Sequence, residues 1–188
     1  MPSPLTIGPH SSLVRLTEHT HDVIIDMMYA RADNFTGQVI YQHGLCFLHP
    51  AAEACLRKAI VGAKGFGFKL KIFDAYRPQQ AHEVLWAYKP DARYVAHPTK
   101  GSNHTRGVAV DLTLLDGTDQ PLDMGTPVDT MTAASHHFYA ALPAAILVNR
   151  MRLLTIMLEA GFVHHPNEWW HYQLPDAMRF PLLTDPLI

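Results

Sequence analysis

The chain has 188 residues, of which 48% are hydrophobic and 17% are charged, with a formal net charge of −2. This length and composition predict one folded domain over residues 1–188. Because lysines and arginines do not cluster, the sequence indicates neither a nucleic-acid partner nor a membrane surface. We see no signal peptide, no apolar run long enough for a membrane span and only two cysteines without a CxxC spacing, so we expect a cytoplasmic protein.

Hydrophobic periodicity and turn residues predict both strands and helices over the first half of the chain. Pro50 favours a helix start because the first helical position needs no N–H donor. The expected elements are strands at 23–29 and 39–41 with a turn at 33–37 between them, a helix at 50–61 with Gly62 and Gly65 as stops, a strand at 68–73, and a helix at 78–88.

The second half of the chain contains a central motif-bearing strand and a long irregular segment. The expected elements are a loop at 89–101, a strand at 108–114, an irregular segment at 119–145, a helix at 149–159 capped by Gly161, and an aromatic-rich strand at 168–174. Since helices mix with hairpin-like strands without a regular βαβ alternation, we predict an α+β fold.

Two possible metal ligands, His104 and Asp111, lie seven positions apart in one motif. In a straight strand they would be roughly 23 Å apart, whereas donor atoms on one zinc ion lie within roughly 3.5 Å of each other. If both bind one ion, the chain must reverse between them, and Gly107 permits that bend. The alternative is that Asp111 is a buried carboxylate paired with backbone N–H groups or with Arg106.

Glu168 and His171 are the best further candidates for a base and a third ligand. Residues three apart in a regular strand point to opposite faces, so both can face the metal only if Glu168 lies at the strand entry, as the residues at 166–167 indicate. An aromatic cluster around a histidine is more often the edge of a core. The adjacent histidines at 136–137 and 164–165 diverge in a strand, and we interpret them as bystanders.

Other residues near these motifs have simple structural explanations when each is taken singly. Arg77 follows a predicted strand and suits a surface salt bridge with Asp74, which would contribute little stability. Asp129 suits a helix cap or a turn, and Tyr29 suits the edge of a core. Arg77 also sits where a predicted strand gives way to a helix, a location that often faces a functional site.

The motifs occur in one order along nearly the whole chain. They are Tyr-x7-Gly at 29–37, Asp-x-Tyr-Arg-Pro at 74–78, Ser-x-His-x6-Asp at 102–111, Met-Gly at 124–125 followed by Asp129 and Met131, and Glu-x-x-His at 168–171. In this combination the chain resembles the D-alanyl-D-alanine dipeptidases, which are VanX-type zinc peptidases related to zinc D,D-carboxypeptidases and to the Hedgehog signalling domain. The resemblance implies a mostly antiparallel sheet with flanking helices.

The same resemblance implies a metal centre with one zinc ion per chain. His104, Asp111 and His171 would be its ligands, leaving a fourth position for water or substrate. Glu168 would be the general base and acid. Arg77 would stabilise the oxyanion of the tetrahedral intermediate.

The resemblance also implies how a substrate is held. Asp129 and Tyr29 would bind the free ammonium group of a dipeptide, and Ser102 would contact the dipeptide itself. The expected reaction is hydrolysis of D-Ala-D-Ala to D-alanine, with a small dipeptide as the partner. The oligomeric state stays open, a homo-oligomer included.

Three alternatives remain at this stage. A zinc D,D-carboxypeptidase would use the same residues on longer peptidoglycan stems, although it would need export. A non-catalytic binding module stabilised by zinc would need neither Glu168 nor Arg77. A non-haem iron oxygenase would use two histidines and a carboxylate, but typically as His-x-Asp, whereas six residues intervene here.

Overall fold

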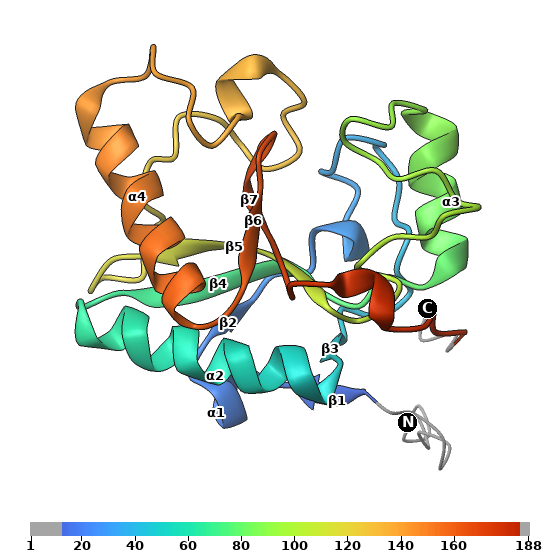
Figure 1. Cartoon of the computed structure of the whole chain (residues 1–188), viewed down its shortest axis with the longest axis horizontal. Coiled ribbons are helices and arrows are strands. Elements are labelled where there is room, and N and C mark those ends of the chain that lie inside the picture. Colours follow the sequence, from blue (N-terminus) through green and yellow to red (C-terminus); the bar gives the residue numbers. More distant parts are fainter. Residues whose placement is uncertain (1–12, 185–188) are drawn as a thin grey trace.

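The computed structural model describes residues 13–184 and is built around a mostly antiparallel sheet (Figure 1). The strand order is β2-β4-β5-β7-β6, in which β2 is parallel to β4 and every other neighbour is antiparallel. A separate ribbon pairs β1 with β3. The strands are β1 (Val14–Leu16), β2 (Ile24–Ile25), β3 (Cys46–Leu48), β4 (Lys69–Asp74), β5 (Ala109–Leu115), β6 (Val163–His165) and β7 (Glu168–Gln173).

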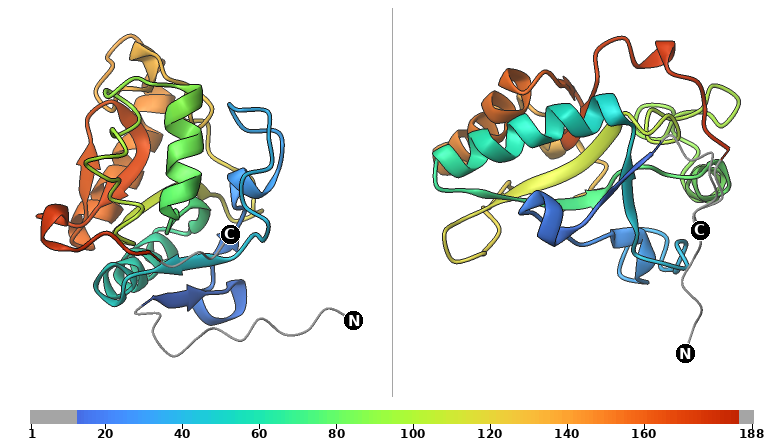
Figure 2. Two further views of the ribbon diagram at one scale, coloured as in Figure 1. Left: turned by 90° about the vertical axis from the view of Figure 1, so that its right-hand side faces the viewer. Right: turned by 90° about the horizontal axis from the view of Figure 1, so that it is seen from below.

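Two long helices, α2 and α4, pack against each other on one side of the sheet, as the view from below shows (Figure 2). Helix α3 stands beyond the carboxyl end of β4 (Figure 1). The helices are α1 (Glu18–His21), α2 (Pro50–Gly65), α3 (Gln79–Tyr88) and α4 (Ala144–Glu159), with 3₁₀ turns η1 (Met28–Ala30), η2 (Ala133–Ser135) and η3 (Ala177–Arg179). The predicted α+β class with a mostly antiparallel sheet is therefore confirmed.

The centre of the sheet is β5, in which all seven residues are buried. Its leucines at 112 and 114 lie on one face, and Asp111 and Thr113 lie on the other, because strand residues alternate. Each fully buried leucine contributes roughly 1.5–3 kcal/mol from apolar burial. Asp111 is thus a carboxylate on a fully buried strand, and such a group requires partners.

Two of the expected strands near the N-terminus are wrong. The strand predicted at 23–29 is only the two-residue β2, followed by η1, which turns Tyr29 away from the sheet. The strand predicted at 39–41 does not form, because the backbone N–H groups of Ile40 and Tyr41 both donate to the Tyr29 carbonyl, each at 2.9 Å. The chain thus folds back on the turn that carries Tyr29.

Two helix boundaries also differ from prediction. Helix α2 continues through Gly62 to Gly65, so the first glycine does not stop it. Helix α4 begins at Ala144, five residues before the predicted start, after Pro143. Strands β1, β3 and β6 and helix α1 were not predicted. Within residues 13–184 no helix is both long and apolar enough to cross a bilayer.

Candidate metal centre

The motif loop reverses direction at Gly107, immediately before β5. Gly107 has φ of +69°, and its N–H donates to the carbonyl of His104 at 2.9 Å. A Cβ atom at this position would lie 2.8 Å from Leu13 Cδ2 and 3.2 Å from the backbone nitrogen of His49. Glycine therefore satisfies both the left-handed conformation and the close packing. The reversal predicted at Gly107 is confirmed.

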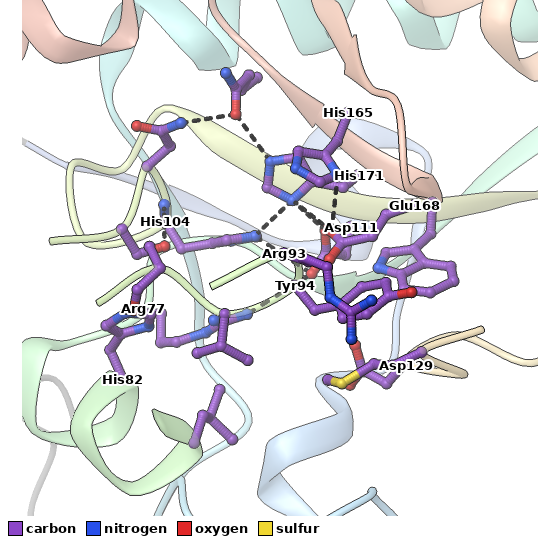
Figure 3. Close-up of a pocket in the computed structure, with 18 of the residues that line it drawn as sticks. Arg77, His82, Arg93, Tyr94, His104, Asp111, Asp129, His165, Glu168 and His171 are labelled. Atoms are coloured by element: carbon purple, nitrogen blue, oxygen red, sulfur yellow. Dashed lines mark hydrogen bonds and ion pairs between the residues drawn. The ribbon is translucent and has the colours of Figure 1, made fainter. Parts of the chain in front are cut away.

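Strands β5 and β7 are paired so that Asp111 lies directly opposite His171. His171 Nδ1 is 3.0 Å from Asp111 Oδ1, and His104 Nε2 is 3.3 Å from Asp111 Oδ2. The two imidazole nitrogens are 3.1 Å apart, and all three side chains are buried (Figure 3). Two imidazole nitrogens and a carboxylate oxygen that converge in this way fit a divalent transition metal with an open coordination position.

Further hydrogen bonds orient both imidazole rings. His104 Nδ1 donates to the carbonyl of Ala75 at 2.7 Å, which leaves Nε2 facing the centre. His171 is reversed: its Nε2 donates to Gln173 Oε1 at 3.1 Å, which leaves Nδ1 facing the centre. Asn103 Nδ2 donates to the same Gln173 oxygen at 2.7 Å. The sequence analysis did not find Gln173 or Asn103, because hydrogen bonds behind a ligand leave no spacing signal.

The short distances between Asp111 and the two histidines shift the pKa values of these groups. Burial alone would raise the pKa of Asp111, but the neighbouring His104 and His171 lower it below its usual range. Burial alone would lower the pKa of His171, but its hydrogen bond to Asp111 and the charges of Asp111 and Glu168 raise it to about 9. In the metal-free protein the two groups therefore form an ion pair.

An irregularity in β7 brings Glu168 to the same side as His171. The register pairs His164 with Tyr172 but His165 with Glu168, so three residues of β7 have no partner on β6. Glu168 Oε2 consequently lies 3.8 Å from His171 Nδ1. Burial raises the pKa of Glu168 to about 8. Glu168 is the first residue of β7, as the predicted strand entry requires.

His165 is a pocket residue that the sequence analysis set aside. Its Nδ1 lies 3.8 Å from Glu168 Oε2, and its ring lies 5.6 Å from the ring of His171. His164 points the other way and contacts His137, with ring centroids 5.2 Å apart. The adjacent histidines do diverge as predicted, but one of two diverging side chains still faces the pocket. The signal in the sequence that could have identified His165 is its position in a short hairpin, where it pairs with Glu168.

Arg77 lies between β4 and α3 and faces the ligand cluster (Figure 3). Its Nε and Nη2 contact Asp74 Oδ2 at 2.9 and 2.7 Å, and Nη2 is 3.8 Å from Asp111 Oδ2. The guanidinium lies over the ring of Tyr29, 5.2 Å from its centroid, and Tyr41 donates to the second oxygen of Asp74 at 2.8 Å. Arg77 is only 7% exposed, so the surface salt bridge considered for it is wrong, although its partner is Asp74.

Asp129 and Tyr29 are 100 positions apart in the sequence, but their side chains meet in the pocket. The Tyr29 hydroxyl donates to Asp129 Oδ2 at 2.7 Å, and Asp129 has φ of +60°. Burial, followed by the charge of Asp111, raises the pKa of Asp129 to about 7. Ser102 accepts the backbone N–H of His104 at 3.2 Å and lies at the edge of the same pocket.

One cavity of about 140 Å³ unites these groups. Helix α3, the loop at 92–96 and the turn carrying Phe35 also contribute residues to its lining. All eight residues singled out from the sequence line it, namely Tyr29, Arg77, Ser102, His104, Asp111, Asp129, Glu168 and His171. A cavity of this size suits a small polar molecule.

The chain is similar to known peptidases over nearly its whole length. Residues 10–187 match the peptidase family M15, described as D-Ala-D-Ala dipeptidase. The D-alanyl-D-alanine dipeptidase of Escherichia coli K12 is 47% identical over 175 residues, covering 93% of this chain and 91% of that protein. Those of Enterococcus faecalis and Streptomyces coelicolor are 35% and 37% identical, covering 86% and 80% of this chain and 90% and 85% of theirs. The chain therefore belongs to the D-Ala-D-Ala dipeptidase family of M15 peptidases.

Proposed function

We propose that this protein is a zinc dipeptidase that hydrolyses D-Ala-D-Ala to two molecules of D-alanine. One observation carries the proposal: a convergent set of metal ligands, a buried carboxylic acid and a buried arginine line a single cavity of about 140 Å³. The names of the relatives support the substrate. A cytoplasmic protein of one domain with a Hedgehog-like fold belongs to the same proposal.

The ligand set is His104, Asp111 and His171, which suits zinc. When bound, zinc would polarise the scissile carbonyl and lower the pKa of a water molecule towards 7. Arg77 is held by Asp74 beside this centre, so its guanidinium can donate to the oxyanion as negative charge develops. Because the guanidinium is fixed in advance, no reorganisation is needed during the reaction.

Glu168 is the group that moves the proton in this proposal. Its Oε2 lies 3.8 Å from His171 Nδ1, so it borders the space in which the attacking water must lie. Its pKa of about 8 applies without a metal, and a neighbouring cation favours the ionised form. Glu168 then takes the proton of the attacking water at Oε2 and delivers it to the nitrogen of the leaving amine.

Asp129, Tyr29 and Ser102 select the substrate in this proposal. A free dipeptide carries a charge at each end, and Asp129 with the Tyr29 hydroxyl offers an acceptor pair for its ammonium group. A longer peptide would place a neutral amide there and leave Asp129 without a counter-charge. Ser102 lines the same cavity, where it can contact the dipeptide itself.

The test is D-alanine release from D-Ala-D-Ala by protein of known zinc content, with L-Ala-L-Ala as the stereochemical control. We expect Glu168→Gln to retain one zinc per chain and to lose about 10²–10⁴-fold in kcat. The matched variant Glu159→Gln changes an exposed glutamate on α4 and should leave the rate unchanged. His171→Ala should lose both zinc and activity. Full hydrolysis by Glu168→Gln would refute the assignment of the base.

A second assay separates this proposal from its rivals. A D,D-carboxypeptidase would release D-alanine from a stem pentapeptide faster than from the free dipeptide, and that result would replace the proposed substrate. A non-catalytic zinc module would release nothing from either. The buried positions of Glu168 and Arg77 beside the ligands favour catalysis over such a module.

A further inference from the structure

Arg150 is a buried arginine on α4 that contacts main-chain oxygens. It is 1% exposed. Its Nε donates to the carbonyl of Met124, Nη1 to that of His136 and Nη2 to that of Ala134, each at 2.8 Å. Burying a guanidinium is costly unless it is fully hydrogen-bonded, and an apolar side chain would fill this space at lower cost. The charge at Arg150 therefore requires an explanation beyond packing.

The three carbonyls belong to the two ends of one loop, residues 124–136, which we call the Asp129 loop. Since the guanidinium is planar and its N–H groups have fixed directions, it can bind all three oxygens in only one arrangement of the loop. Asp129 lies near the middle of the loop in a left-handed conformation, φ +60°. Its carboxylate accepts the hydrogen bond of the Tyr29 hydroxyl in this arrangement of the loop.

Other contacts hold the Asp129 loop to the strand that carries Glu168. Ser135 Oγ donates to the carbonyl of Thr130, and it lies 2.9 Å from Thr126 Oγ1. Trp169 Nε1 donates to Thr126 Oγ1 at 3.0 Å. In Figure 1 this segment runs between β5 and α4 beside the β6–β7 hairpin. The loop is thus fixed by β7 on one side and by Arg150 on the other.

We propose that Arg150 is a positioning residue for substrate selection, holding the Asp129 loop so that the Asp129 carboxylate faces the substrate's ammonium group. The inference rests on the proposed role of Asp129. If the guanidinium of Arg150 is removed, the affinity for a dipeptide with a free ammonium group should fall more than the rate of bond cleavage. Arg150 does not touch the substrate, so it acts only through Asp129.

The experiment compares Arg150→Lys and Arg150→Met with Arg152→Met, which removes an exposed arginine from the same helix. The substrates are D-Ala-D-Ala and its N-acetyl derivative, which lacks the ammonium group. For Arg150→Met we expect KM for the free dipeptide to rise about tenfold or more while kcat falls less than about threefold. The preference in kcat/KM for the free over the acetylated dipeptide should fall about tenfold. Zinc content should not change.

Hydrogen exchange reads the loop directly and keeps the test valid if Arg150→Met folds poorly. Arg150→Lys retains the charge but has a single nitrogen in place of the three that donate to the carbonyls of Met124, His136 and Ala134. In this variant, amides of the Asp129 loop should exchange about tenfold faster, while those of α2 should not. Unchanged exchange, or faster exchange with an unchanged preference for the free dipeptide, would overturn the inference. No hydrolysis of D-Ala-D-Ala by the wild-type protein would overturn the proposed function as well. The variant Asp129→Asn serves as the reference, because it removes the carboxylate that is proposed to bind the ammonium group.

Discussion

Replacing Gln173 with leucine tests whether the hydrogen bond behind His171 sets metal affinity. Gln173 Oε1 accepts His171 Nε2 at 3.1 Å and Asn103 Nδ2 at 2.7 Å. These two bonds hold the imidazole with Nδ1 facing Asp111. Leucine occupies a similar volume but accepts nothing, so the ring loses its orientation and two donors lose their partner.

The expected size of the effect follows from where Gln173 lies. Removal of an outer partner of a metal-binding histidine typically weakens binding by about 10–100-fold. A tenfold change corresponds to about 1.4 kcal/mol. Gln173 is only half-buried, so water can partly replace the lost acceptor. We therefore expect the lower end of the range, a zinc affinity about tenfold weaker.

Competition between the protein and a chromophoric chelator would measure the zinc affinity of each variant. Gln173→Glu keeps the acceptor and adds a negative charge, so its affinity should equal or exceed that of the wild type. Gln120→Leu removes an exposed glutamine from a turn and serves as the matched control. A zinc affinity of Gln173→Leu within about twofold of the wild type would refute the reasoning, because removing the hydrogen-bond partner of a ligand histidine should weaken zinc binding by more than that.

Three further predictions concern the same site. Because His171 has a pKa of about 9 and Glu168 one of about 8 without metal, zinc binding at pH 7 should release one to two protons in weakly buffered solution; no release would contradict these protonation states. The raised pKa of His171 also means that its pairing with Asp111 stabilises the metal-free protein at low pH and is lost as the pH rises through about 9. Gly107→Ala should lower the free energy of unfolding by about 1–3 kcal/mol in chemical denaturation and weaken zinc binding, whereas Gly117→Ala, with open space around it, should change neither.

Two central strands were predicted from the sequence to within one residue at each end. The alternation predicted at 68–73 appears as β4, and the strand predicted at 108–114 appears as β5. Strand β6 has no such pattern, because it exists only through pairing with β7. The strand expected at 39–41 does not form, because two of its N–H groups donate to the carbonyl of Tyr29 in the preceding turn.

The candidate site was predictable in its residues but not in its geometry. Motif spacing and family resemblance identified eight of the residues that line the pocket. The reversal at Gly107 followed from the seven-residue spacing, on the condition that His104 and Asp111 bind one ion. The partners of His171, by contrast, depend on which residue of β5 faces which residue of β7. The three-residue irregularity opposite β6 is equally non-local, and it decides that Glu168 and His165 both face the pocket.

The metal centre and the sheet therefore constrain each other. Asp111 and His171 meet because they are direct partners on adjacent antiparallel strands. Since side chains alternate along a strand, a slip of one residue between β5 and β7 would turn one of the two ligands to the opposite face. Such a slip would also leave the Asp111 carboxylate buried on the central strand without its partner His171. A metal bound by these residues would thus favour the native register, and the native register brings the candidate ligands together.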